Sequence, residues 1–170
     1  GSNLGVNISY KKQEKPNGIA ESFLIGEDFI ENDDVSLILG DNIFHGNGFI
    51  SNINMAKKDL SLGFSSIFGV SVDNPKNFGV VEFDKNNKPI KIIEKPKNPK
   101  SSIIVSGLYF YTNDVVKIAK NLNFSKRGEK EITDINNHYL NQKKLKLNIL
   151  NSHISWIDTG TYSSLIKASK

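Results

Sequence analysis

A short apolar run from Val35 to Leu39 is followed at once by Gly40-Asp41-Asn42, and this junction constrains the fold more than any other segment. Short β-prone runs without polar alternation are typical of strands that are buried on both faces of a parallel sheet. A helical spacing from Phe49 to Leu60 and a second β-prone run from Phe64 to Val70 come next. Strand, helix and strand in this order predict a βαβ unit, so we expect an α/β fold with a doubly wound, Rossmann-like sheet.

The rest of the chain supplies further elements for such a sheet. Alternating apolar residues from Val6 to Tyr10 indicate a half-buried strand before the turn pair Asn17-Gly18. Apolar spacing over 19–30 fits one face of a helix that Gly26 interrupts near its end. We also expect an inserted antiparallel hairpin over 79–83 and 89–93, a strand over 103–111, helices over 113–121 and 131–140, a strand over 145–150 and a final helix over 161–168.

The length of 170 residues and the composition predict one globular, soluble domain. Hydrophobic residues make up 38% and charged residues 24% of the chain, and it contains no apolar run of the roughly eighteen residues that a membrane span needs. The absence of cysteine excludes disulfides and zinc–thiolate sites. Because the start of the chain lacks the charged-then-apolar pattern of a secretory signal, we expect a cytoplasmic protein.

The positive charges are scattered. Lys and Arg total 22 against 18 Asp and Glu, but the lysines form only short groups such as Lys11-Lys12 and Lys143-Lys144. Without a continuous basic stripe or interleaved aromatic residues, we expect no nucleic-acid partner. Arg127 is the only arginine, which makes it a candidate for bidentate recognition of a phosphate or carboxylate.

Two acidic residues lie at positions where metal or ligand binding is expected. Asp41 follows the predicted buried strand, and open α/β sheets bind ligands at the carboxyl ends of their strands. Asp158 lies in Trp156-Ile-Asp-Thr-Gly160, before the last predicted helix. A pair of distant carboxylates suits Mg²⁺ that bridges phosphates. Each acid is also a common helix N-cap or turn residue, so both interpretations stay open at this point.

Each of the other candidate groups can have an ordinary structural role instead of a ligand-binding one. Glu94-Lys95-Pro96 closes the predicted hairpin and can grip a hydroxyl and a phosphate, or form a surface ion pair. Lys126-Arg127-Gly128-Glu129 can hold an anion or form a loop. Asn17-Gly18 and Gly79 are turn or strand-end residues first, and close-approach points for a ligand second.

The motif order is more specific than any single motif. In sequence, the chain carries Asn17-Gly-Ile-Ala20, Leu39-Gly-Asp-Asn42, Phe78-Gly-Val-Val-Glu-Phe83, Glu94-Lys-Pro96, Ser106-Gly-Leu-Tyr-Phe110, Glu131-Ile-Thr-Asp134 and Trp156-Ile-Asp-Thr-Gly-Thr161. This set resembles the bacterial glucose-1-phosphate thymidylyltransferases, which are sugar nucleotidyltransferases, over nearly the whole chain. Related uridylyl and cytidylyl transferases share only parts of it.

The resemblance implies a nucleotidyl transfer without a covalent enzyme intermediate. A phosphate oxygen of glucose 1-phosphate attacks the α-phosphorus of dTTP, which gives pyrophosphate and dTDP-glucose, a precursor of deoxysugars. By similarity, Asp41 and Asp158 hold Mg²⁺ against the phosphates. Lys95 and Arg127 are the implied catalytic residues, and they contact the sugar-phosphate oxygens.

The resemblance also assigns substrate-binding residues. Gly79 and Val105 hold the glucose hydroxyls through their main chain, together with the Glu94 side chain. Asn42 and Gly18 contact the nucleotide portion. The parent protein is expected to be a homo-oligomer.

The chain departs from the family pattern at three places. Phe78 stands where the family often has a tyrosine. The family's glycine-rich triphosphate loop has no counterpart in the sequence, and neither do its C-terminal helices. We therefore expect residues 1–170 to be the central part of one nucleotidyltransferase domain, with little turnover alone.

Two alternatives to this function remain. The chain can be a non-catalytic module that binds sugar nucleotides, or part of a transferase that uses UTP or CTP. Base choice in particular rests on the resemblance and on no visible chemistry.

Overall fold

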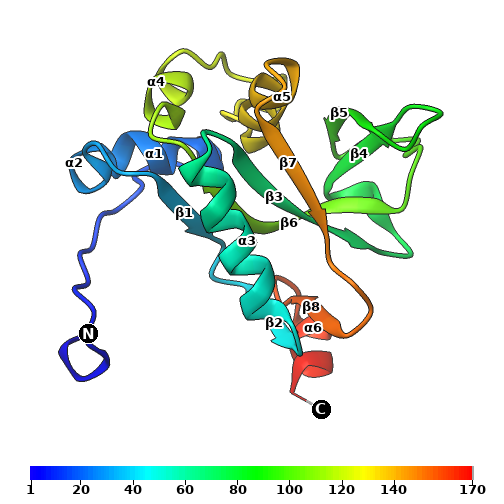
Figure 1. The fold of residues 1–170 in the computed structure, drawn as a ribbon, viewed down its shortest axis with the longest axis horizontal. Coiled ribbons are helices and arrows are strands. Elements are labelled where there is room, and N and C mark those ends of the chain that lie inside the picture. Colours follow the sequence, from blue (N-terminus) through cyan, green and yellow to red (C-terminus); the bar gives the residue numbers. More distant parts are fainter. Residues whose placement is uncertain (170) are drawn as a thin grey trace.

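The computed structural model describes residues 1–169 as a mixed α/β fold (Figure 1), which confirms the predicted fold class. The strands are β1 (Val35–Ile38), β2 (Asn42–Gly46), β3 (Ser65–Ser71), β4 (Gly79–Phe83), β5 (Pro89–Glu94), β6 (Ile103–Tyr111), β7 (Leu145–Ile149) and β8 (Ile154–Asp158). The α-helices are α1 (Ser22–Ile25), α2 (Glu27–Ile30), α3 (Phe49–Ser61), α4 (Val115–Lys120), α5 (Ile132–Asn141) and α6 (Tyr162–Ala168). Short 3₁₀ turns form at Ser2–Leu4, Ile19–Glu21 and Pro75–Asn77.

The main sheet is built around β6. Its order is β5-β4-β6-β3-β7, and β1 pairs with β6 on the edge opposite β3. The β1–α3–β3 unit is present as predicted, but β6 runs antiparallel between its two strands. The sheet is therefore mixed, with the parallel pairing of β3 and β7 at one side. The predicted hairpin is also present as β4 and β5, where Gly79 lies opposite Glu94.

The alternation of side chains along β6 divides the core. Tyr109 and Tyr111 belong to a cluster that packs under α4 and α5, whereas Leu108 and Phe110 belong to a second cluster that packs under α3. All four side chains are buried, because successive residues of a strand point to opposite faces and both faces carry helices. The sheet is thus covered on both faces around β6. The run from Val35 to Leu39 does not have the predicted two-sided burial in a parallel sheet, because β1 pairs antiparallel with β6 and Ile38 is 57% exposed.

A second sheet was not predicted. It consists of β2 and β8, which pair antiparallel in a register that places Asn42 opposite Asp158. Figure 1 shows this pair beyond the end of α3, beside the last helix α6. The pair brings the two acid-containing motifs together although more than a hundred residues separate them in the sequence.

Two further sequence predictions need correction. The segment from Val6 to Tyr10 is not a strand, and its apolar side chains are at least half exposed, because no described strand pairs with it. The helix predicted over 19–30 is divided into a 3₁₀ turn, α1 and α2, and Gly26 separates the last two.

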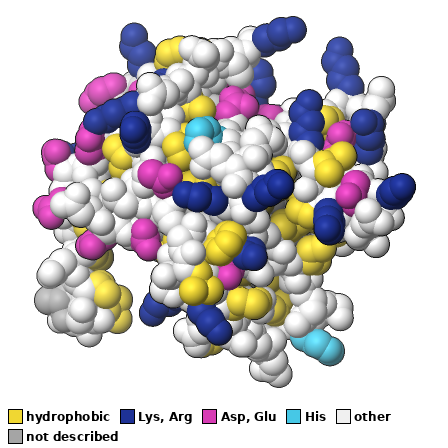
Figure 2. All heavy atoms as spheres, turned by 45° about the horizontal axis from the view of Figure 1, so that its top comes forward, with side chains coloured by type: hydrophobic (Ala, Val, Ile, Leu, Met, Phe, Trp, Pro, Cys, Tyr) yellow, Lys and Arg dark blue, Asp and Glu magenta, His cyan; other side chains and the backbone are white. Residues whose placement is uncertain are grey.

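On the face shown in Figure 2, lysines and acidic side chains are interspersed and form no continuous basic stripe. No helix within residues 1–169 is both long and apolar enough to cross a membrane.

Candidate functional site

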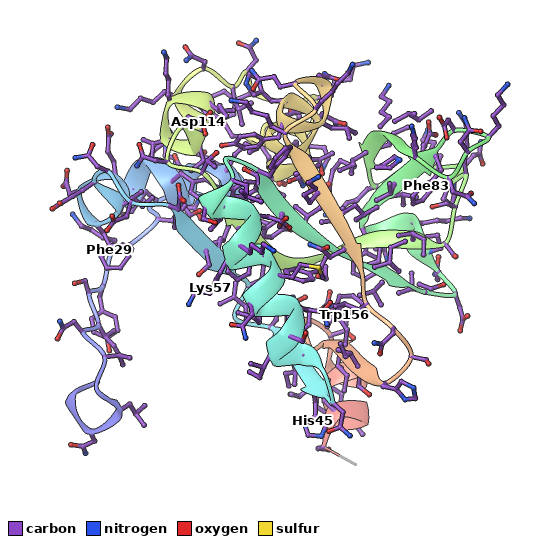
Figure 3. The ribbon with its side chains drawn as sticks, viewed as in Figure 1. Phe29, His45, Lys57, Phe83, Asp114 and Trp156 are labelled. Atoms are coloured by element: carbon purple, nitrogen blue, oxygen red, sulfur yellow. The ribbon has the colours of Figure 1, made fainter. Side chains whose placement is uncertain are left out.

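A cavity of about 170 Å³ lies where the β4–β5 hairpin, β6, α5 and the β2–β8 pair meet. Six of the predicted site residues line it, namely Asn42, Gly79, Glu94, Lys95, Val105 and Asp158. Further lining residues are Ile19, Leu39, Asn77, Phe78, Gly107, Tyr109, Ile132, Thr133, Asn136 and Trp156. Trp156 belongs to β8 (Figure 3), and its ring packs edge-on against that of Phe78, with the ring centroids 5.6 Å apart. The volume is below the roughly 300–1,000 Å³ of sites for drug-sized ligands, so it suits one ring-sized group.

The carboxylates of Asp41 and Asp158 converge beside this cavity. A Cβ atom added to Gly160 would lie 2.9 Å from Asp158 Oδ1 and 3.0 Å from Asp41 Oδ2. The loop is held in place because the main-chain N–H and the hydroxyl of Thr159 both donate to the Asp41 carbonyl oxygen, at 2.7 and 2.8 Å. A larger residue at this position would require the two carboxylates to shift.

Neither acid caps a helix. Asp41 immediately precedes β2, and α6 takes Thr161 as its N-cap, with a capping box to Ser164. The capping interpretation of Asp41 and Asp158 is therefore wrong. Their carboxylates have a different environment, at the junction of two sheets.

The two carboxylates fit a divalent cation. Asp41 Oδ1 accepts from the Asn42 amide and Asp158 Oδ1 accepts from the Gly160 N–H, both at 2.8 Å. The other oxygen of each carboxylate has no hydrogen-bond partner among the described residues. Two free carboxylate oxygens suit Mg²⁺, which usually takes one or two protein carboxylates and completes its shell with waters and phosphates. No group of three or more His, Cys, Asp or Glu side chains within residues 1–169 has metal-binding geometry.

Asn42 connects three strands. Its Oδ1 accepts from the Gly107 N–H at 3.0 Å and from the Trp156 indole N–H at 2.6 Å, while its Nδ2 donates to Asp41. A Cβ atom on Gly107 would lie only 2.7 Å from the Asn42 side chain. Asn42 lines the cavity, but its polar atoms are already engaged in holding Asp41 and Trp156 in place.

Glu94 is the acid at the centre of the pocket wall. Its Oε2 accepts from the Thr133 hydroxyl at 2.5 Å, and its Oε1 lies 3.5 Å from Arg127 Nη1. Burial raises the pKa of Glu94, and the neighbouring Glu131 carboxylate adds to this, against the hydrogen bond from Thr133 and the charges of Lys95 and Arg127. The side chain is suited to accept hydrogen bonds from ligand hydroxyls.

Lys95 leaves the hairpin in an unusual conformation. Its φ is 43°, in the left-handed region, and its N–H donates to the Phe78 carbonyl at 3.0 Å. The side chain is exposed at the pocket rim. A flexible ammonium group there can reach a phosphate outside the cavity.

Arg127 lies outside the cavity lining and is linked to it through Glu94. Its guanidinium also pairs with Glu129 at 2.8 Å and Glu131 at 3.4 Å. The side chain is 38% exposed, so it is accessible to a ligand at the rim. In this structure Arg127 is held by three glutamates.

Gly18 has a structural reason to be glycine. Its φ is 100°, and a Cβ atom would lie 2.3 Å from the Lys130 carbonyl oxygen. Gly18 is not part of the cavity lining, although the next residue, Ile19, is. Its contact with a nucleotide stays a prediction.

Sequence reasoning missed several pocket residues. Thr133 and Asn136 lie in α5. Thr133 was noted only as part of the Glu131–Asp134 motif, and nothing in the local sequence marks Asn136 as pocket-lining. Tyr109 and Gly107 lie in β6, where a glycine inside an apolar strand is a usable signal of close approach. Trp156 was noted only as part of a motif.

Comparison with known proteins identifies the family of the chain. The sequence model described as Nucleotidyl transferase matches residues 1–170. The glucose-1-phosphate thymidylyltransferase of Mycolicibacterium smegmatis is 48% identical over 169 residues, which is 99% of this chain and 58% of that protein. The protein of the same name from Neisseria meningitidis is 47% identical over 168 residues, with the same two shares. This chain thus spans little more than half the length of these relatives.

Solved structures share the fold. A glucose-1-phosphate thymidylyltransferase candidate from Bacillus anthracis, in complex with a sucrose, superposes with a TM-score of 0.82 at 40% identity and covers 98% of this chain and 65% of its own. A UDP-glucose pyrophosphorylase complexed with UDP-glucose has the same TM-score at 23% identity, over 95% of this chain and 64% of its own. The match over residues 1–170 and the shared fold establish that this chain belongs to the nucleotidyl transferase family.

Proposed function

We propose that this chain is the sugar-phosphate and metal-binding part of an enzyme that transfers a thymidylyl group from dTTP to glucose 1-phosphate. The observation that carries the proposal is the convergence of Asp41 and Asp158 beside a ring-sized pocket. The pocket wall carries the Glu94 carboxylate, with Lys95 and Arg127 at its rim. Relatives with 47–48% identity are named for this reaction.

The substrate contacts fall into two groups, those to the sugar inside the cavity and those to the phosphate at its rim. The glucose ring occupies the cavity, where Glu94 accepts from its hydroxyls and the main chain of Gly79 and Val105 supplies further hydrogen bonds. Lys95 and Arg127 contact the phosphate at the rim, where charge-assisted hydrogen bonds are strongest. When the phosphate binds, the Arg127 guanidinium replaces some of its ion pairs with glutamates by contacts with the phosphate.

The reaction is an in-line displacement at phosphorus. An oxygen of the sugar phosphate forms a bond to the α-phosphorus of dTTP, and the bond to the pyrophosphate leaving group breaks. Asp41 and Asp158 would hold a Mg²⁺ ion, which would supply positive charge to neutralise the phosphates. Asn42 keeps Asp41 oriented, and Gly18 contacts the nucleotide portion in this proposal. Orientation and electrostatic stabilisation supply most of the rate enhancement.

Calorimetric titration tests the metal assignment. We expect dTDP-glucose to bind more tightly with Mg²⁺ than with EDTA, and this difference to vanish in Asp41→Asn and Asp158→Asn. Asp28→Asn is the matched control, because Asp28 is an exposed acid on α2, outside the pocket. A Mg²⁺ effect that survives in both site variants would overturn the assignment.

The same titration tests which nucleotide base the site prefers. We expect dTDP-glucose to bind more tightly than UDP-glucose and CDP-glucose. Tighter binding of either of the other two would move the proposal to a uridylyl or cytidylyl transferase.

A further inference from the structure

Asn136 lies on the face of α5 that forms the floor of the pocket. It lines the cavity together with Ile132 and Thr133, which are four and three residues earlier and therefore share its side of the helix. The residue is only 1% exposed. Such a position gives its amide little contact with bulk water.

One end of the Asn136 amide is fixed by a buried tyrosine. The Tyr111 hydroxyl donates to Asn136 Oδ1 at 2.6 Å. Tyr111 is fully buried, stacks on Tyr139 at 5.6 Å and meets the edge of Phe23 at 5.5 Å, so its hydroxyl has little freedom to move. Asn136 Oδ1 therefore already accepts a hydrogen bond, and Nδ2 is the other polar atom of the amide.

Asn136 Nδ2 is a donor without an acceptor. It is buried and has no hydrogen-bond partner among the described residues. A buried amide group that gives up water without a replacement is costly, and such groups in native proteins usually have a partner. Because the residue lines the cavity, the partner can come from the bound ligand.

Two other donors on this wall are already engaged. The Trp156 indole N–H donates to Asn42, and the Thr133 hydroxyl donates to Glu94. A sugar hydroxyl both donates and accepts, so one that donates to Glu94 still requires a donor from the protein. Asn136 Nδ2 can supply it.

We propose that Asn136 is a specificity-determining residue whose Nδ2 donates a hydrogen bond to one hydroxyl of the hexose in this pocket. The inference rests on the proposed function, since it takes the cavity as the sugar site. It adds a residue that selects for a hydroxyl at one ring position. A sugar that lacks this hydroxyl leaves the donor unpaired again and binds more weakly.

The test compares glucose 1-phosphate with its 2-, 3-, 4- and 6-deoxy analogues by calorimetry on the 170-residue chain. Asn136→Asp keeps the acceptor for Tyr111 and removes the donor. We expect this variant to bind glucose 1-phosphate roughly three- to tenfold more weakly. We also expect it to lose the discrimination that the original chain shows against one of the deoxy analogues.

Asn137→Asp is the matched control. Asn137 is the next residue of α5, and its amide donates to the Ile92 carbonyl at 2.7 Å and accepts from the Ile92 N–H at 2.9 Å. It is a structural asparagine that does not line the cavity. We expect Asn137→Asp to lower the stability of the fold and to leave the relative affinities of the five sugar phosphates unchanged.

A second measurement covers the case in which Asn136→Asp folds poorly. In the ¹⁵N-labelled original chain, the Asn136 side-chain amide signals should shift when glucose 1-phosphate is added, with Asn136→Gln used for assignment. Unshifted signals under saturating ligand would overturn the proposal. So would a uniform loss of affinity for all five ligands in Asn136→Asp. If the original chain binds no glucose 1-phosphate at all, the proposed function itself fails, and this inference fails with it.

Discussion

Lys95 holds a left-handed backbone conformation directly after the strand that carries Glu94. A side chain in this region costs about 1–2 kcal/mol, and a glycine there relieves the cost but adds about 0.5–1 kcal/mol of backbone entropy to the unfolded chain. We therefore expect Lys95→Gly to raise stability by up to about 1 kcal/mol in urea unfolding. Binding of glucose 1-phosphate should weaken by at least about tenfold, because a charged hydrogen bond to the phosphate is lost.

Lys143 provides the control for this change. It has a φ of 58°, is exposed and lies after α5, away from the cavity lining. Lys143→Gly should change stability as Lys95→Gly does and leave binding unchanged. Equal loss of binding in both variants would contradict a role for the Lys95 ammonium group.

Glu94 predicts a pH dependence of stability. Because burial raises its pKa above the ordinary value of 4.5, the folded protein binds a proton at Glu94 more readily than the unfolded chain does. The contribution of Glu94 to stability is therefore fully present below about pH 4.5 and is lost as the pH rises through the raised pKa. Glu94→Gln should become more stable relative to the original chain as the pH rises from 4 to 7. Urea midpoints measured across this range check the prediction, and a constant difference would contradict it.

At the level of elements, the contact of β6 with β2 depends on Gly107. Its Cα faces the Asn42 side chain, which in turn orients Asp41 and Trp156. Gly107→Ala forces Asn42 away and should cost about 1–3 kcal/mol, as overpacking usually does. Because Trp156 is the only tryptophan, its fluorescence should change in the folded variant.

Gly40→Ala is the matched control for Gly107→Ala. No atom lies within 4 Å of the position of its Cβ, and its φ is not in the left-handed region. We expect little change in stability or fluorescence. If Gly107→Ala behaves in the same way, Gly107 does not control the position of Asn42.

The elements that sequence could predict are those with a strong local pattern. The hairpin of β4 and β5 combines apolar runs with a turn in which Asp84 Oδ1 accepts from the N–H groups of Asn86 and Lys88. The β2–β8 pair was missed because β2 is short, ends at Gly46 and pairs with a strand far away in the sequence. The segment from Val6 to Tyr10 has the apolar alternation of a strand, but no described strand pairs with it. Alternation in the sequence does not show whether a neighbouring strand is present.

The site was predictable to a similar degree. Asp41 stands out because it follows β1, and Asp158 because its motif precedes the last helix. Motif order placed Glu94 and Lys95 with them. Asn136 could not be found, because its importance depends on which face of α5 meets the pocket and on a hydrogen bond from Tyr111. Such relations arise only from tertiary packing.

At the level of the whole molecule, the apolar side chains near the N-terminus bear on assembly. Val6, Ile8 and Tyr10 are 50%, 52% and 87% exposed, and exposed apolar side chains favour association where they meet in one patch. We expect concentration-dependent oligomers in light scattering, which Ile8→Ser with Tyr10→Ser should reduce without changing the urea midpoint. A chain that stays monomeric at all concentrations would contradict this expectation.

The central claim is that the Asp41–Asp158 pair and the adjoining pocket together form one site for a metal and a sugar nucleotide. A crystal structure of the chain with Mg²⁺ and dTDP-glucose tests it most directly. We predict the hexose between Glu94 and Asn136, with the metal between the two aspartates and the diphosphate. A metal bound elsewhere, or a sugar outside this pocket, would contradict the account.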